Sequence, residues 1–198
     1  MPTGGQLPAT KGSTVTTTAS HITNSPPATW QTDIVRSSPA RMTLGLLRIV
    51  IGWSFLWAFI DKLFGLGFAT ESGKGMVDGG QPAQGFMSHA SGPFSGFFSS
   101  ISGRWADYGF MFGLLAIGVA LITGCGLKLA AVAGATLLGL MYLAQFPVGA
   151  DAGTYNNPLF DSHWVDGLAV IALWFTRAGD TFGLGRWWGG KVGDSWLR

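Results

Sequence analysis

Charge is the scarcest property of this chain, because Asp, Glu, Lys and Arg together make up 11% of its 198 residues. The net charge of +2 and the lack of any basic run argue against nucleic-acid binding, which requires clustered Lys and Arg. A single cysteine, Cys125, excludes an intramolecular disulfide, a CxxC redox motif and an iron–sulfur cluster held by cysteines alone. We expect Cys125 to be a small packing residue.

Long apolar runs are what the chain has instead. A helix that crosses the roughly 30 Å hydrocarbon core of a bilayer needs about 20 apolar residues. Four stretches after Arg41 approach that length, at about 42–66, 108–125, 129–146 and 158–177. The second and third carry no charge, whereas a helix in water needs a polar face. The sequence therefore predicts an all-α, polytopic membrane protein whose domain is a bundle of four transmembrane helices in a lipid bilayer.

Local signals refine these spans. Small residues at helical spacing predict surfaces where membrane helices approach closely. Asn before Pro predicts a capped helix start for the fourth span. The residues concerned are Gly45 and Gly52 on the first span, Gly109-xxx-Gly113 on the second, Ala130-xxx-Gly134 on the third and Asn157-Pro158 before the fourth.

Three parts of the chain follow from this pattern: a flexible tail over 1–41, a transmembrane domain over 42–178 and a C-terminal segment over 179–198. Lys and Arg gather in the tail and in the C-terminal segment, which by the positive-inside rule predicts a multi-pass protein of the cell membrane with both termini in the cytoplasm. The connection 67–107 is expected to form short helical segments parallel to the membrane interface. An ordered lid over the mouth of the bundle fits that connection equally well.

The first span carries charges of its own. Thirteen residues separate Arg48 from Asp61 and Lys62, which puts them about 20 Å apart, at opposite depths of one helix. A charge in the hydrocarbon layer is costly, so such residues extend toward headgroups or face a polar interior. We expect Arg48 to reach inner phosphates and Lys62 outer ones, with a functional polar site as the alternative.

The start of the fourth span holds the best candidates for chemistry. Asp161, His163 and Asp166 are titratable, and we predict that they are the catalytic residues. His163 and Asp166 are three residues apart and so share a helix face. A histidine paired with a carboxylate can exchange protons when a quinone is reduced or a quinol is oxidised. The competing interpretation is that the three residues only cap and solvate a helix end.

Other polar residues are expected at the same depth, because successive spans run in opposite directions. Asp61 and Lys62 end the first span there, and Gln145 ends the third. Together with Trp57 they are predicted to contact a quinone or to complete a polar cluster with the residues of the fourth span.

A metal or haem site is not expected. The other two histidines lie in the tail, at His21, and in the connection, at His89, so His163 has no second histidine across the bundle to share a haem. The acidic residues beside His163 match no recognised spacing of metal ligands.

Three runs of sequence resemble the DoxX-type membrane proteins, which include the DoxD-like large subunit of thiosulfate:quinone oxidoreductase. These runs are RIVIGWSFLWAFIDKL at 48–63, NPLFDSHW at 157–164 and GLGRWW at 183–188. The resemblance covers roughly residues 42–190 and leaves the tail unmatched. It implies a four-helix membrane subunit that passes electrons to the quinone pool or takes part in membrane-linked thiol and oxidative-stress defence.

Two functions of different classes remain open. In the first, the bundle is a quinone-reactive subunit of an oxidoreductase, with no tightly bound cofactor, and a partner protein carries the redox centre. In the second, the bundle is a non-catalytic membrane anchor or assembly subunit of a larger complex, or a homo-oligomer. A transporter is less favoured, because the sequence shows no inverted repeat and no clearly broken span.

Overall fold

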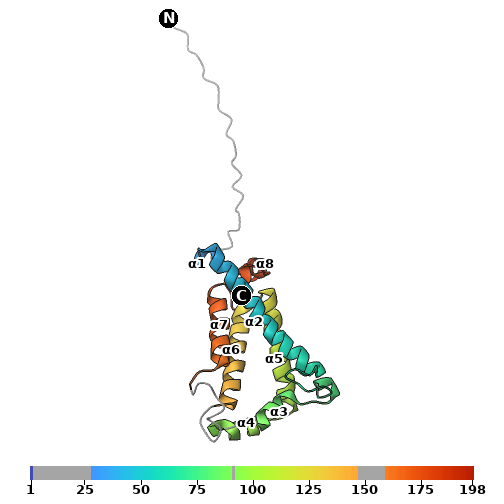
Figure 1. Cartoon of the computed structure of the whole chain (residues 1–198). Helices are drawn as coiled ribbons and strands as arrows, with labels where there is room; N and C mark the ends of the chain where they lie inside the picture. Colours follow the sequence, from blue (N-terminus) through green and yellow to red (C-terminus); the bar gives the residue numbers. More distant parts are fainter. Residues whose placement is uncertain (2–27, 91, 147–158) are drawn as a thin grey trace.

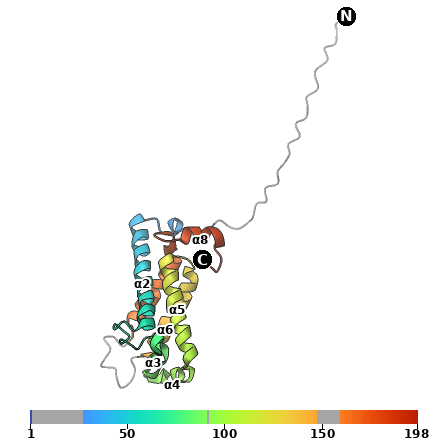
Figure 2. The same ribbon diagram turned by 90° about the vertical axis from the view of Figure 1, so that its right-hand side faces the viewer.

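The protein is built from helices. The structure, a computed structural model, describes Met1 and residues 28–90, 92–146 and 159–198, and every regular element in those residues is helical. The four principal helices are α2 (Ser38–Phe64), α5 (Arg104–Thr123), α6 (Leu127–Ala144) and α7 (Ser162–Phe175). They extend between the two ends of the molecule, where the short helices lie, and α2 runs obliquely to α6 and α7 (Figures 1 and 2). The all-α prediction is confirmed for this part of the chain.

Three of the principal helices are long and apolar enough to cross a membrane: α2, α5 and α6. This is consistent with a membrane protein. The fourth, α7, has 14 residues and is therefore about 21 Å long, less than the roughly 30 Å of a hydrocarbon core. The length of α7 does not by itself make it a fourth span.

All four principal helices start at other residues than the predicted spans: α2 and α5 start four residues earlier, α6 two residues earlier and α7 four residues later. α2 begins at Ser38, four residues before the predicted span, because the Ser37 hydroxyl accepts a hydrogen bond from the Ala40 N–H and Pro39 suits a first helical turn. α7 begins at Ser162 with Asp161 as its N-cap. The predicted cap, Asn157 with Pro158, lies outside the described residues, as do residues 2–27 of the predicted flexible tail.

Close packing of two helix pairs forms the core. α2 packs most extensively against α5, and α6 against α7. Between α2 and α5 the approach is so close that a Cβ at Gly52 would lie 2.9 Å from the Ile122 nitrogen, and one at Gly118 would lie 2.9 Å from the Leu56 nitrogen. The predicted Gly109 has no neighbour within 4 Å of an ideal Cβ among the described residues, so it makes no such close contact with them. The buried hydrophobic side chains at the centre include Ile51, Phe55, Leu114, Ile117, Leu121, Leu138, Val170 and Leu173.

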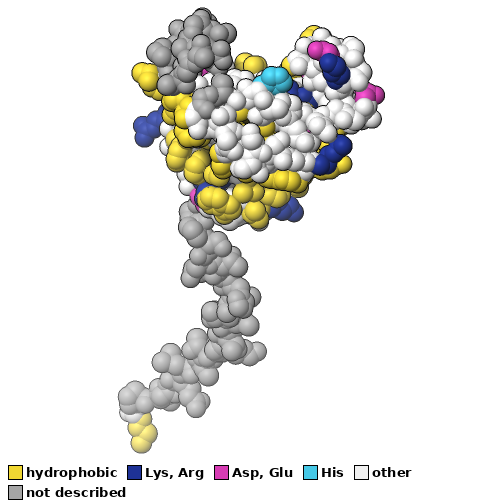
Figure 3. Space-filling model, turned by 90° about the horizontal axis from the view of Figure 1, so that it is seen from below, with side chains coloured by type: hydrophobic (Ala, Val, Ile, Leu, Met, Phe, Trp, Pro, Cys, Tyr) yellow, Lys and Arg dark blue, Asp and Glu magenta, His cyan; other side chains and the backbone are white. Residues whose placement is uncertain are grey.

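The connection between α2 and α5 closes one end of the bundle with short helices. They are η1 (Met76–Asp78), α3 (Pro82–Ser88), η2 (Gly92–Phe94) and α4 (Ser95–Ile101). Asp107, which is fully buried, fixes α3: its carboxylate accepts hydrogen bonds from the Ala83 and Gln84 N–H groups at 2.9 and 3.1 Å. Figure 3 looks at this end and shows few charged side chains on it, with hydrophobic side chains gathered along one flank.

The opposite end carries α1 (Gln31–Ile34), η4 (Ala178–Asp180) and α8 (Gly185–Val192). The residues before α2 meet the C-terminal residues at this end (Figure 1). Thr29 donates hydrogen bonds to Asp194 from its N–H and its hydroxyl, each at 2.9 Å. Asp194 also pairs with Arg177 at 3.0 Å and with Arg198 at 2.7 Å. Residues 28–37 are therefore joined to the C-terminal segment and do not belong to a free tail.

Candidate functional site

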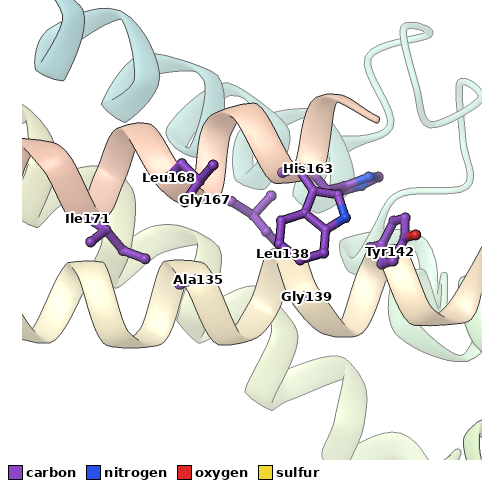
Figure 4. A pocket seen from close by; sticks show the side chains of 9 residues that line it. Ala135, Leu138, Gly139, Tyr142, His163, Gly167, Leu168 and Ile171 are labelled. Atoms are coloured by element: carbon purple, nitrogen blue, oxygen red, sulfur yellow. The ribbon is translucent and has the colours of Figure 1, made fainter. Parts of the chain in front are cut away.

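An apolar groove lies between α6 and α7 at the end of the bundle nearest the α2–α5 connection. Its volume is about 200 Å³. Figure 4 shows His163 and Tyr142 at one end of the groove and Ile171 at the other. Gly139 and Gly167 form part of its floor, where larger side chains would fill it; the remaining lining residues are Ala135, Leu138, Trp164 and Leu168.

His163 and Tyr142 are the titratable residues that line this groove, and His163 is paired with a carboxylate. Its Nδ1 lies 2.6 Å from Asp161 Oδ2, and the two side chains are 16% and 31% exposed. The pairing follows from local structure, because Asp161 is the N-cap of α7 and its other oxygen accepts the His163 N–H at 3.0 Å. With Nδ1 held by the carboxylate, Nε2 is the ring nitrogen available to a ligand in the groove.

Aromatic rings surround the histidine end of the groove. Tyr142 and Trp164 meet edge to face with centroids 5.6 Å apart, and Tyr142 makes the same type of contact with Phe146 at 5.6 Å. The Tyr142 hydroxyl donates to the Leu159 carbonyl at 2.8 Å, which ties the end of α6 to the segment before α7. Leu168 is 60% exposed and Trp164 41%, so the groove opens on the outer flank of the bundle.

Asp166, the third predicted catalytic residue, lies outside this pair. It is half-buried one turn along α7, and it does not line the groove. The structure thus brings His163 together with Asp161 and not with Asp166, although the latter is the residue with which it shares helical spacing. The N-cap folds the Asp161 side chain back over the first turn, which a face-by-face count along the helix does not reveal.

The predicted residues of the first span lie elsewhere. Asp61 is 1% exposed and accepts hydrogen bonds from the Phe68 N–H at 3.4 Å and the Thr70 N–H at 2.8 Å, so its carboxylate holds the turn after α2. Trp57 packs edge-on against Phe68, with centroids 5.2 Å apart. Lys62 lines a separate polar cavity of about 970 Å³ formed with the connection.

Gln145 is exposed and forms the C-cap of α6, and it does not line the groove either. The single polar cluster predicted from α2, α6 and α7 is therefore divided in two. The reason is visible in Figure 1: α2 follows α5 away from α6 and α7 toward this end of the bundle. The packing of Gly52 against α5 sets that course.

Arg48 occupies a site that the sequence did not predict. It is fully buried, so the expectation that it extends to headgroup phosphates is wrong. Its guanidinium donates to two carbonyls of the last turn of α5, those of Leu121 and, at 2.8 Å, Ile122. The other three acceptors, 2.9 to 3.3 Å away, are the carbonyls of Ala178, Thr181 and Phe182.

These bonds complete the end of α5. The last carbonyls of a helix have no partner within it. Here the Ala120 carbonyl accepts from Gly124 and the Thr123 carbonyl from Leu184, each at 2.8 Å, while Arg48 serves the two carbonyls between them. The negative end of the helix dipole also compensates the buried positive charge. Arg48 therefore stabilises the bundle, and its guanidinium is occupied by backbone carbonyls.

Two residues of this region escaped the sequence analysis. Tyr142 lies within an uncharged apolar span. The one sequence feature that could have placed it near the polar end of α6 is that Gln145 follows it by three residues. Asp107 stood at the edge of the second span, and its partners on α3, 23 and 24 residues away, leave no pattern in the sequence.

Comparisons with protein-family models, with curated proteins and with solved structures find no match for this chain. The function must therefore be argued from the geometry of the groove.

Proposed function

We propose that this protein is a multi-pass subunit of the cell membrane that binds a quinone in the groove between α6 and α7 and exchanges electrons with a partner protein. The observation that carries the proposal is the His163–Asp161 pair, 2.6 Å apart, at the mouth of a small apolar groove. A quinone needs this combination, because its ring is apolar and its carbonyl oxygens take up protons on reduction.

The proton chemistry follows from the pair. Reduction of a quinone to a quinol consumes two electrons and two protons. The partner supplies both electrons, and the imidazolium of His163 transfers one proton from Nε2 to a quinone oxygen while Asp161 holds Nδ1–H and stabilises the charged ring. Solvent at the mouth of the groove supplies the second proton and then reprotonates His163. Quinol oxidation uses the same path in reverse, with the electrons passing to the partner.

The family resemblance points in the same direction. Membership of the DoxX-type proteins is part of this proposal, in which the partner carries the redox centre. It also makes α7 the fourth transmembrane helix, whose 14 residues cross the bilayer together with the described residues on either side, 159–161 and 176–180.

The orientation belongs to the proposal as well. Both described ends of the chain, with Arg36, Arg41, Arg177 and Arg186, lie at the end that we assign to the cytoplasm. α3 and α4 then lie at the outer interface of the membrane. An impermeant maleimide tests this: with Cys125 changed to Ser, a cysteine at exposed Ser195 should react only in inside-out vesicles and one at exposed Ser72 only in right-side-out vesicles. The reverse result would invert the assignment.

One observation favours a second function, that of a non-catalytic anchor or assembly subunit. Gly109 is open, with no neighbour within 4 Å of an ideal Cβ, and the Cβ of Gly113 would have only Leu137 near it, at 4.0 Å. This part of α5 can therefore receive a helix of another protein or of a second copy.

A pair of glycine variants separates the two functions. Gly139→Leu fills the quinone groove and Gly109→Leu fills a different apolar cavity, and both positions have open space at Cβ. We expect saturable binding of a short-chain quinone to the purified protein to weaken about tenfold or more in Gly139→Leu and in His163→Ala, and to stay unchanged in Gly109→Leu. Quinone binding that survives both groove variants would refute the proposal. Loss of a co-purifying partner in Gly109→Leu would instead support the assembly role.

A further inference from the structure

The C-terminal end of the chain forms a rigid surface, which we call the C-terminal platform: residues 185–198 together with Lys128. α8 lies across the end of the bundle in this region (Figure 2). Its first residue packs so tightly on the chain that a Cβ at Gly185 would collide with the Gly179 backbone. The Trp188 indole N–H donates to the Leu197 carbonyl at 2.7 Å, and the Arg198 guanidinium packs on Gly189. The platform is thus fixed at a set height relative to the spans.

Two arginines at this end are neutralised within the protein. Arg198 pairs with Asp194 at 2.7 Å and with Asp180 at 3.4 Å, and Arg177 pairs with Asp194 at 3.0 Å. Burial and the nearby charge of Arg198 lower the pKa of Arg177, while Asp194 and Asp180 oppose that shift. The carboxylates beside the platform are therefore already used by these arginines.

Three further cations on the platform have no such partner. Lys128, Arg186 and Lys191 form no ion pair with a carboxylate anywhere in residues 28–90, 92–146 and 159–198. Arg186 and Lys191 are exposed on α8, and Lys128 is half-buried at the start of α6. No carboxylate of the described residues neutralises these three charges.

Tryptophans stand between these cations. The Lys128 ammonium lies 4.4 Å from the ring centroid of Trp196 and 5.7 Å from that of Trp174, and the Lys191 ammonium lies 6.0 Å from that of Trp187. Trp187 is 59% exposed and Trp196 54%. Indole rings that are apolar on their faces and polar at N–H concentrate at the headgroup level of membranes.

We propose that the C-terminal platform binds anionic phospholipid headgroups, with Lys128, Arg186 and Lys191 contacting phosphates and the exposed indoles inserted among the headgroups. The occupant follows from the arrangement: the cations are spread along a surface at the end of membrane-length helices and alternate with tryptophans, which matches a sheet of many phosphates. This inference does not depend on quinone chemistry, since the groove lies at the opposite end of α6.

Lipid retention tests the proposal. The full-length protein is placed in nanodiscs of equal parts phosphatidylglycerol and phosphatidylcholine, and native mass spectrometry counts the lipids that stay bound after release. We expect phosphatidylglycerol to be retained on the order of a hundredfold over phosphatidylcholine, with the preference falling about fivefold for each of Lys128→Gln, Arg186→Gln and Lys191→Gln and declining at high salt.

Matched controls keep the test sharp. Lys74→Gln and Arg104→Gln remove exposed cations at the opposite end, and they should leave the preference unchanged. Lys191→Arg retains the charge and should retain the preference, even if packing is altered. Equal retention of the two lipids by the unmodified protein, or the same loss of preference in the Lys74 and Arg104 controls, would overturn the assignment.

Discussion

Replacement of Arg48 by methionine should destabilise the bundle more than any substitution of an exposed cation. Methionine keeps a long apolar side chain but removes every donor that the guanidinium offers to the five surrounding carbonyls. The change also separates two interpretations of the residue. An arginine that extended to headgroups would be nearly indifferent to this replacement, whereas an arginine that completes the end of α5 would not.

The magnitude follows from burial. The carbonyls of Leu121 and Ala178 bond to Arg48 in buried surroundings, and the other three acceptors are partly buried. Water can reach the partly buried carbonyls, but each buried one left without a donor costs about 1–3 kcal/mol. Two such carbonyls give a loss of about 3 kcal/mol. For a chain of this size that corresponds to a fall of about 6–12 °C in the thermal midpoint.

The assay is thermal unfolding of the detergent-solubilised protein, with the reactivity of Cys125 toward maleimide as a second readout. Cys125 follows Gly124, where a Cβ would lie 3.3 Å from the Arg48 guanidinium carbon, so loss of Arg48 should loosen this turn and speed the labelling. The Arg48→Lys variant has an ammonium with three donors for five carbonyls. Its thermal midpoint should therefore lie between that of the unmodified protein and that of Arg48→Met. Arg186→Met is the exposed control. A midpoint for Arg48→Met within about 2 °C of the control would refute the structural role.

Two further predictions concern the helix contact and the ion network. Gly52→Val should lower the free energy of unfolding by about 1–3 kcal/mol or more, because its side chain would collide with the backbone of α5. In the same unfolding assay Gly113→Val should lower it far less, because the nearest atom to a Cβ there is 4.0 Å away. Burial alone would raise the pKa of Asp194, but hydrogen bonds from Thr29 and the charges of Arg177 and Arg198 outweigh it and lower that pKa. Asp194 therefore stabilises the fold above its ordinary pKa of 3.8, and this contribution disappears as the pH falls through the lowered value. Asp194→Asn should flatten the decline in thermal midpoint between about pH 4 and about pH 2, and an unchanged slope would count against the network.

Hydropathy and helix length were enough to predict the helical architecture, because an apolar run of about 20 residues has few other solutions. The termini of the helices were harder. Ser37 caps α2, although the apolar run itself indicated a start further along the chain. Asp161 caps α7, although Asn157-Pro158 indicated an earlier start. Capping is decided by the local backbone, and several polar residues near a helix start compete for the role.

The sequence was enough to select single residues of the candidate site, but it did not show which of them lie next to one another. His163 and Asp161 were singled out from the sequence, and the structure places them in contact. Asp61 was expected beside them, yet α2 takes a different course because of its contact through Gly52 with α5. The partners of Arg48 were hidden for another reason: they are backbone carbonyls, which every residue carries and which no side-chain pattern marks.

The position of Arg48 also bears on how the protein is made. Its acceptors on α5 lie 73 and 74 residues further along the chain, and those after α7 lie 130 to 134 residues further. All five acceptors are therefore synthesised after α2, and the Arg48 guanidinium has none of them until then. The guanidinium of Arg48 therefore has its full set of acceptors only once the chain has been synthesised as far as Phe182, so this contact between the first and last parts of the bundle forms late.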